Sequence, residues 1–266
     1  MNSITFLGTG NAAVKSCFNT CFILNTDKFK LLVDAGGGNG VLTQLDRAGV
    51  PLTDIHYMYL THAHTDHILG AVWIVRMIAQ LYKRGKYSGE LHIYGHDRVL
   101  YCLKTICEML LPKKIQLFGT QTILHEVTDG DVFEIFDAKF SVFDIRSVKE
   151  KQFGFKVNLS NGLNVVCLGD EPFNINNKHY VENADWLLSE AFCLYKDKDE
   201  FHPYEKNHST SLDAGKIASE LNVKNLLLYH TEEKNLINRK ELYSAEAKSV
   251  YCGNIFVPND LETIQL

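Results

Sequence analysis

The segment from Leu60 to Gly70 holds the densest group of potential metal ligands in the chain. It reads Leu-Thr-His-Ala-His-Thr-Asp-His-Ile-Leu-Gly and supplies His62, His64, Asp66 and His67. In an extended loop, residues two apart point the same way, so His62 and His64 can hold one metal ion. Asp66 and His67 follow at the turn and can reach a second ion. Imidazole and carboxylate ligands together suit Zn²⁺, with Mn²⁺ or Fe²⁺ as alternatives, so we predict one or two such ions here.

A pair of metal ions needs further ligands, and the ends of two apolar strands offer them. Asp170 follows the apolar run 165–168, and His230 follows the run 226–229. A carboxylate at Asp170 could bridge two ions about 3.5–4 Å apart and hold a hydroxide between them. Each residue alone is equally typical of a polar strand end. Beside the histidine cluster, we predict that both are metal ligands.

Asp34 follows another buried strand and precedes three glycines. We predict that Asp34 orients the histidine loop by hydrogen bonds. The alternative is that it caps the helix expected near residue 40. The nearby segment Gly8–Ala13 imitates a dinucleotide-binding fingerprint, but a strand rather than a helix follows it, which excludes NAD binding.

The elements that position these residues follow from hydrophobic periodicity. Helices are predicted at about 40–48, 68–83 and 97–110, from about 210 onward, and near 238–248. Strands are predicted at 3–7, 20–24, 28–33, 55–60, 91–94, 121–127, 131–136, 139–145, 153–159, 163–168, 186–191, 225–229 and 254–257. Each half of the chain has strands with helices outside them. The expected fold is therefore α/β, a four-layer αββα sandwich of two mostly antiparallel sheets in a single domain over residues 1–266.

Composition narrows the class of protein. The chain has 266 residues, 45% of them hydrophobic and 22% charged, which is typical of a globular protein. A net charge of −5 argues against a strongly basic nucleic-acid or membrane binder. No apolar run approaches the roughly 20 residues of a membrane span. The chain has seven cysteines, an odd number, and no two of them form a CxxC motif. We therefore expect a reduced, cytoplasmic protein.

The set Asp34, His62-x-His64-x-Asp66-His67, Asp170 and His230 resembles the metallo-β-lactamase superfamily over nearly the whole chain. Within that superfamily, three segments are similar to ribonuclease Z: 4–12, 189–191 and 208–210. The resemblance implies the αββα fold already expected. It also implies a metal-dependent hydrolase that uses a metal-bound hydroxide, most readily a phosphodiesterase.

The resemblance also suggests roles for three side chains. Asp66 would orient or deprotonate the attacking water while it binds metal. His208 would protonate the leaving group and Glu190 would position His208. A histidine beside a helix N-terminus suits a phosphate or oxyanion site, although Ser209 or Thr210 would equally explain this segment as a helix cap.

Two departures from the family pattern stand out. The family places a metal-binding histidine after the strand expected at 139–145, where this chain has Arg146. Guanidinium cannot ligate a metal, so one metal site would be weakened, or His125, His179 or His202 would substitute. Alternatively, Arg146 binds an anionic substrate directly. The second departure is length, because only 23 residues separate Arg146 from Asp170 and leave no room for the tRNA-binding arm of ribonuclease Z.

These observations predict a small or flexible phosphodiester as substrate and disfavour tRNA. No membrane partner is expected, and a homodimer is left open. Two other functions are kept as alternatives. The first is a catalytically weak or inactive metal- or nucleotide-binding protein, which Arg146 suggests. The second is a hydrolase of thioesters or lactones, which nothing in the sequence excludes.

Overall fold

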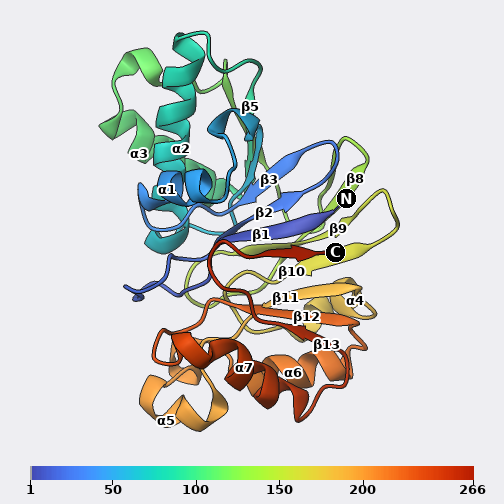
Figure 1. Cartoon of the computed structure of the whole chain (residues 1–266). Helices are drawn as coiled ribbons and strands as arrows, with labels where there is room; N and C mark the ends of the chain where they lie inside the picture. The colour runs from blue at the N-terminus through green and yellow to red at the C-terminus, as the bar shows by residue number, and fades with distance from the viewer. Residues whose placement is uncertain (1) are drawn as a thin grey trace. The chain divides into compact units, whose positions relative to one another are not determined.

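The computed structural model describes residues 2–266, which form two compact units. The first unit contains the chain up to Gly8, Phe18–Thr128 and Asp260–Leu266. The second unit contains Thr9–Cys17 and Asp129–Asn259. Each unit has its own sheet and its own helices, and both termini belong to the first (Figure 1).

The sheet of the first unit has seven strands within residues 2–266, in the order β14-β1-β2-β3-β4-β5-β6. Their bounds are β1 Ser3–Gly8, β2 Cys21–Asn25, β3 Lys30–Val33, β4 Tyr57–Tyr59, β5 Leu91–Gly95, β6 Thr122–Glu126 and β14 Thr263–Gln265. Pairs from β14 to β3 are antiparallel, and pairs from β3 to β6 are parallel. The predicted hairpin turn at residues 25–27 joins β2 to β3, where the Thr26 hydroxyl donates to the Phe29 carbonyl at 3.0 Å.

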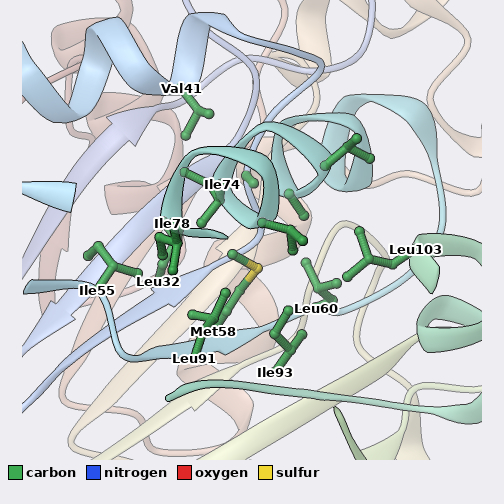
Figure 2. Close-up of a cluster of buried hydrophobic side chains, with 14 of the residues drawn as sticks. Leu32, Val41, Ile55, Met58, Leu60, Ile74, Ile78, Leu91, Ile93 and Leu103 are labelled. Atoms are coloured by element: carbon green, nitrogen blue, oxygen red, sulfur yellow. The ribbon is translucent and has the colours of Figure 1, made fainter. Parts of the chain in front are cut away.

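Three helices belong to this unit: α1 Gly40–Arg47, α2 Thr65–Lys83 and α3 Asp97–Leu110. The apolar face of α2 packs against the sheet and forms part of the core. Ile74 and Ile78 point toward Leu32 and Met58 of the sheet (Figure 2). Helix α2 begins directly after His64, whose backbone is extended, and ends where Gly85 adopts a positive φ of 66°. The core therefore fixes the helix whose first turn carries Asp66 and His67.

The sheet of the second unit also has seven strands within the described residues, in the order β13-β12-β11-β10-β9-β8-β7. Their bounds are β7 Val132–Ile135, β8 Ala138–Asp144, β9 Phe153–Asn158, β10 Asn164–Cys167, β11 Trp186–Glu190, β12 Asn225–Tyr229 and β13 Asn254–Phe256. Pairs from β7 to β10 are antiparallel and pairs from β10 to β13 are parallel.

The helices of the second unit are α4 Lys178–Val181, α5 Lys198–Phe201, α6 Ser211–Glu220 and α7 Arg239–Lys248. Short 3₁₀ turns across both units lie at Leu52–Asp54, Lys113–Ile115, Ile175–Asn177, Tyr195–Asp197, Tyr204–Lys206 and Leu236–Asn238. Helix α6 starts with a capping box in which the Thr210 hydroxyl and the Asp213 carboxylate each bond the other residue's backbone N–H. This cap fixes the segment that directly follows His208.

The predicted α/β class with two sheets and outer helices is confirmed, but the mostly antiparallel pairing is wrong. Each sheet is half parallel, because helices connect β3 to β4, β4 to β5 and β5 to β6, and again β10 to β11, β11 to β12 and β12 to β13. A helical crossover returns the chain in the same direction and produces parallel neighbours. Among residues 2–266, no helix combines the length and apolar character that a membrane crossing requires.

Gly70 gives a test of the close approach between α2 and the loop after β3. An added Cβ would lie 1.8 Å from the Ala35 carbonyl oxygen, and the Gly70 N–H donates to the Gly36 carbonyl at 2.9 Å. We expect Gly70→Ala to lower the free energy of unfolding by about 1–3 kcal/mol or more, because the neighbouring atom is backbone and cannot rotate away. Chemical denaturation measures this. The control is Gly49→Ala, which meets no neighbouring atom and carries only the strain of its positive φ. Equal losses in the two variants would contradict the close-packing argument.

Candidate metal centre

Asp34 lies at the end of β3 and holds the predicted histidine loop. Its Oδ1 accepts the Thr61 N–H at 2.9 Å, and its Oδ2 accepts the Thr61 hydroxyl at 2.7 Å and His67 Nδ1 at 2.7 Å. Helix α1 begins at Gly40, where the capping residue is Asn39. The hydrogen-bonding arrangement predicted for Asp34 is therefore present, and the helix-capping alternative is wrong.

The four predicted ligands of the loop are close together in the first unit. His62 Nε2 lies 2.9 Å from His64 Nδ1, and His67 Nε2 lies 3.3 Å from the Asp66 carboxylate. Two nitrogens bound to one tetrahedral zinc ion would be about 3.3 Å apart, given Zn–N bonds of about 2.0–2.1 Å. The spacing of His62 and His64 is thus close to that of two ligands on one ion. Their binding of a metal ion stays a prediction.

Hydrogen bonds also orient the imidazole rings. The Thr61 hydroxyl donates to Asp34, so its oxygen is the acceptor for His62 Nδ1 at 2.9 Å. In the neutral rings the Nδ1 protons of His62 and His67 point to Thr61 and Asp34. Each Nε2 then carries the lone pair that a metal ion requires.

His67 is completely buried between two carboxylates. Burial opposes its charged form, but Asp66 and Asp34 outweigh that cost and raise the pKa of His67 well above its ordinary value. In the absence of metal, a proton therefore binds this ring more tightly than it binds an ordinary histidine. A cation is favoured at this position, whether it is a proton or a metal ion.

Asp170 and His230 lie together in the second unit at the ends of β10 and β12. His230 Nε2 is 3.6 Å from Asp170 Oδ2, and both side chains are buried. Gln152 fixes Asp170 from two sides, since its amide donates to the Asp170 carboxylate and its carbonyl oxygen accepts the Asp170 N–H at 3.0 Å. The structure thus places both predicted strand-end ligands side by side.

His208 and Glu190 also lie together in the second unit. His208 Nδ1 is 3.6 Å from Glu190 Oε2, and the His208 ring stacks on Phe192 with 4.7 Å between ring centroids. Glu190 is fully buried and accepts the backbone N–H groups of Phe192 and Ser209. Ligand atoms of Glu190, His208 and His230 lie within 4.8 Å of one another. Thr210 caps α6, so the helix cap considered as the alternative explanation of this segment is present. A role of His208 in catalysis stays a prediction.

Arg146 follows β8 with a positive φ of 62°. Its guanidinium lies 2.7 Å from Asp129 and 3.3 Å from Asp144, and about half of the side chain is exposed. The substitute ligands considered from sequence have other partners. His125 bonds His92 at 2.9 Å, His202 lies 3.3 Å from Glu205, and the His179 ring contacts Tyr180 with 4.0 Å between centroids.

Two polar residues of the second unit were missed from the sequence. Gln152 bonds Asp170, and Glu171 accepts the Ser147 hydroxyl at 2.5 Å while its side chain is only 3% exposed. Glu171 follows a predicted ligand directly in sequence, which was the available signal. Gln152 gave no signal, because a glutamine at the start of a strand is common.

The ligand set fits a transition-metal ion. Imidazole nitrogens and carboxylate oxygens are the ligands that Zn²⁺, Mn²⁺ and Fe²⁺ accept in proteins. In the first unit, ligand atoms of Asp34, His62 and His67 lie within 4.8 Å of one another. Burial raises the pKa of the Cys107 and Cys193 thiols to about 12, which disfavours the thiolate that a nucleophile or metal ligand requires at these two positions.

Comparison with known proteins gives a family and a fold. A family model described as anti-Pycsar protein Apyc1 matches residues 2–242. Ribonuclease Z of Nanoarchaeum equitans is 26% identical, over 90% of this chain and 86% of that protein. The probable metallo-hydrolase YhfI of Bacillus subtilis is 25% identical, over 88% and 87%.

Solved structures agree with these relatives. The crystal structure of Bacillus subtilis YhfI, a metallo-β-lactamase fold protein, has a TM-score of 0.80 at 21% identity and covers 99% of this chain and 98% of that one. Human tRNase Z, short form, has a TM-score of 0.77 at 20% identity with the same coverage. The predicted metallo-β-lactamase fold and the resemblance to ribonuclease Z are therefore confirmed.

The raised pKa of His67 makes metal binding dependent on pH. Below that pKa a proton occupies the ring, so a metal ion must displace it, and the apparent affinity should rise with pH until the raised pKa is passed. Titration calorimetry of metal-free protein with Zn²⁺, in buffers of different ionisation enthalpy, should show proton release at neutral pH.

Asp34→Asn should release fewer protons, because it removes one of the two carboxylates that raise the His67 pKa. The matched control is Asp54→Asn, since Asp54 is a partly exposed carboxylate 3.0 Å from Lys30. Zinc binding with the same heat in every buffer would contradict this account of His67.

Proposed function

Because the chain belongs to the family of the anti-Pycsar protein Apyc1, we propose that it is a phosphodiesterase for small or flexible phosphodiesters. At the coarser level the chain is a metal-dependent hydrolase of the metallo-β-lactamase superfamily, like its relatives. The observation that supports the proposal is the segment at the start of α2, where the Asp34 carboxylate accepts hydrogen bonds from Thr61 and His67 and the His62 and His64 imidazoles lie 2.9 Å apart. The family is described as anti-Pycsar, so we propose that this chain also acts against Pycsar.

The proposed metal ligands are the six predicted from sequence: His62, His64, Asp66, His67, Asp170 and His230. Zinc is the proposed ion, in one or two copies, since it accepts this mixture of nitrogen and oxygen ligands. A bound ion would supply a water of lowered pKa and would neutralise charge on the phosphoryl oxygens. The chain's own part is to hold these ligands rigidly, which Asp34 and Gln152 do by hydrogen bonds.

Proton transfer is assigned to two side chains. Asp66 orients or deprotonates the attacking water, as a carboxylate in the first turn of α2. His208 protonates the leaving group, and Glu190 positions it by fixing the backbone on both sides of the ring. Arg146 is proposed to bind the anionic substrate, in addition to its contacts with Asp129 and Asp144.

The short connection between Arg146 and Asp170 supports a small substrate. Its 23 residues contain the hairpin of β9 and β10 with the tight turn at Asn161-Gly162. The chain thus has strand and turn where the ribonuclease Z family is expected to carry an arm that grips tRNA. The net charge of −5 adds no general attraction for a polyanion.

Thioester or lactone hydrolysis is the second candidate function, since the same ligands would activate water toward a carbonyl. A weak or inactive binding protein is the third, and it rests on Arg146. We further propose that the protein is cytoplasmic, because its cysteines are thiols in the structure.

The activity is tested with bis(4-nitrophenyl) phosphate and a precursor tRNA as parallel substrates. We expect metal-dependent hydrolysis of the small diester and poor trimming of the tRNA. Efficient, salt-sensitive tRNA trimming would overturn the substrate assignment. Hydrolysis of neutral thioesters or lactones alone would support the second candidate.

With a diester whose leaving group is an alkyl alcohol, His208→Ala should lower kcat by about 10²–10⁴, the usual contribution of a general acid, with unchanged metal content. With bis(4-nitrophenyl) phosphate the loss should be much smaller, because 4-nitrophenolate leaves without a proton. Asp66→Asn should lower both kcat and metal content. The control is His202→Ala, because His202 is an exposed histidine beside Glu205. A wild-type kcat in His208→Ala would remove His208 from the mechanism.

A homodimer is proposed because α2 and α3 expose large apolar side chains. These are Trp73, Tyr82, Tyr101, Met109 and Leu110. Exposed apolar groups of this size favour a protein partner, and a second copy is the simplest one. Light scattering should give a mass near twice 30.2 kDa, and Met109→Asp combined with Leu110→Asp should give a monomer. A monomeric wild type at micromolar concentration would refute the dimer.

A further inference from the structure

Lys149 is a cation beside His208 that the proposed mechanism does not use. Its Nζ lies 3.5 Å from His208 Nε2 and 3.4 Å from Glu171 Oε1. The Lys149 side chain is 27% exposed, so a ligand from solvent can reach it. His208 thus has a carboxylate, Glu190, near one ring nitrogen and an ammonium group near the other.

A network of partly buried and exposed hydrogen bonds holds the segment that carries this lysine. The Ser147 hydroxyl donates to Glu171 Oε1 at 2.5 Å and accepts the Lys149 N–H at 3.1 Å. The Asn207 amide donates to Glu171 Oε2. Glu171 therefore ties the segment that carries Lys149 to the residue directly before His208.

The distance between Lys149 and His208 suits a shared oxygen. Hydrogen bonds from charged nitrogens to anionic oxygens are about 2.7–2.9 Å long. An oxygen at that distance from both Lys149 Nζ and His208 Nε2 fits their 3.5 Å separation. Without such an oxygen, the two nitrogens face each other at the outer limit of a hydrogen bond.

We propose that Lys149 is a substrate-binding residue that holds an anionic phosphoryl oxygen next to His208 Nε2, with Glu171 as its positioning residue. This inference rests on the proposed phosphodiesterase function and narrows its substrate class. The substrate must carry a negative charge at the scissile ester. A neutral thioester or lactone would leave Lys149 without a partner on the substrate.

The test uses the metal-loaded full chain, with bis(4-nitrophenyl) phosphate as substrate and inorganic phosphate as competitive inhibitor. Lys149→Met keeps the length of the side chain and removes its charge. We expect KM and the phosphate inhibition constant each to rise about tenfold, as for the loss of one ionic hydrogen bond of about 1.4 kcal/mol. Metal content and Tm should stay at wild-type values, and Lys149→Arg should recover most of the affinity.

The matched control is Lys151→Met, which removes a lysine whose Nζ lies 5.1 Å from the centre of the Phe153 ring. It should leave both constants unchanged. Unchanged constants in Lys149→Met would overturn the proposal. A lower Tm with an unchanged phosphate constant would also overturn it, because Lys149 would then serve structure alone. Lys149→Gln is the replacement if Lys149→Met does not fold.

Failure of the proposed function is distinguishable from failure of this inference. If metal-loaded wild type hydrolyses no diester, the function is wrong. Direct binding of inorganic phosphate, followed by ³¹P line broadening in wild type and Lys149→Met, still decides whether Lys149 holds a phosphoryl oxygen. Equal broadening in both proteins would refute it.

Discussion

The first unit's potential metal site depends on a single buried carboxylate, that of Asp34. Three elements meet at it, because Asp34 ends β3, Thr61 follows β4 and His67 lies in the first turn of α2. Loss of this carboxylate would leave buried donors of Thr61 and His67 without their acceptor, at about 1–3 kcal/mol each. Asp34 itself has a positive φ of 54°, a strained conformation that these hydrogen bonds offset. Asp34 thereby fixes the His67 ring directly, and it fixes Thr61, the acceptor of His62 Nδ1.

In the second unit, too, a buried carboxylate at a strand end accepts hydrogen bonds that hold a neighbouring segment. Glu190 ends β11, is fully buried and accepts two backbone N–H groups, one on each side of the stacked pair Phe192 and His208. Gln152 does the equivalent for Asp170. In both units, a buried acceptor at a strand end holds a loop whose side chains would otherwise be mobile. Charge-assisted hydrogen bonds in a dry interior are strong enough for this.

The sequence predicted most of the elements because their signals are local. Periodic apolar residues defined α2 and α3, and the alternation of strands with turns defined both sheets. Strand direction was predicted wrongly for half of the strand pairs, because it depends on crossovers between distant segments. The four-residue helices α4 and α5 and the three-residue strand β14 were missed, since so few residues carry no measurable period. The role of Asp34 was predicted from its position after a buried strand. Gln152 and Glu171 were not, because their partners lie 18 and 24 residues away and only the fold brings them together.

The electrostatic effect predicted for Arg146 differs from the one that its surroundings in the structure support. An isolated guanidinium at the position of a family ligand would repel a metal ion, and that reasoning predicted a weakened site. The guanidinium instead lies 2.7 Å from Asp129 and 3.3 Å from Asp144, so its charge is largely balanced. It is also half exposed, and water screens what remains. The charge of Arg146 is therefore a weak reason to expect a low affinity for a second metal ion. The absence of a histidine ligand at this position is the reason that remains.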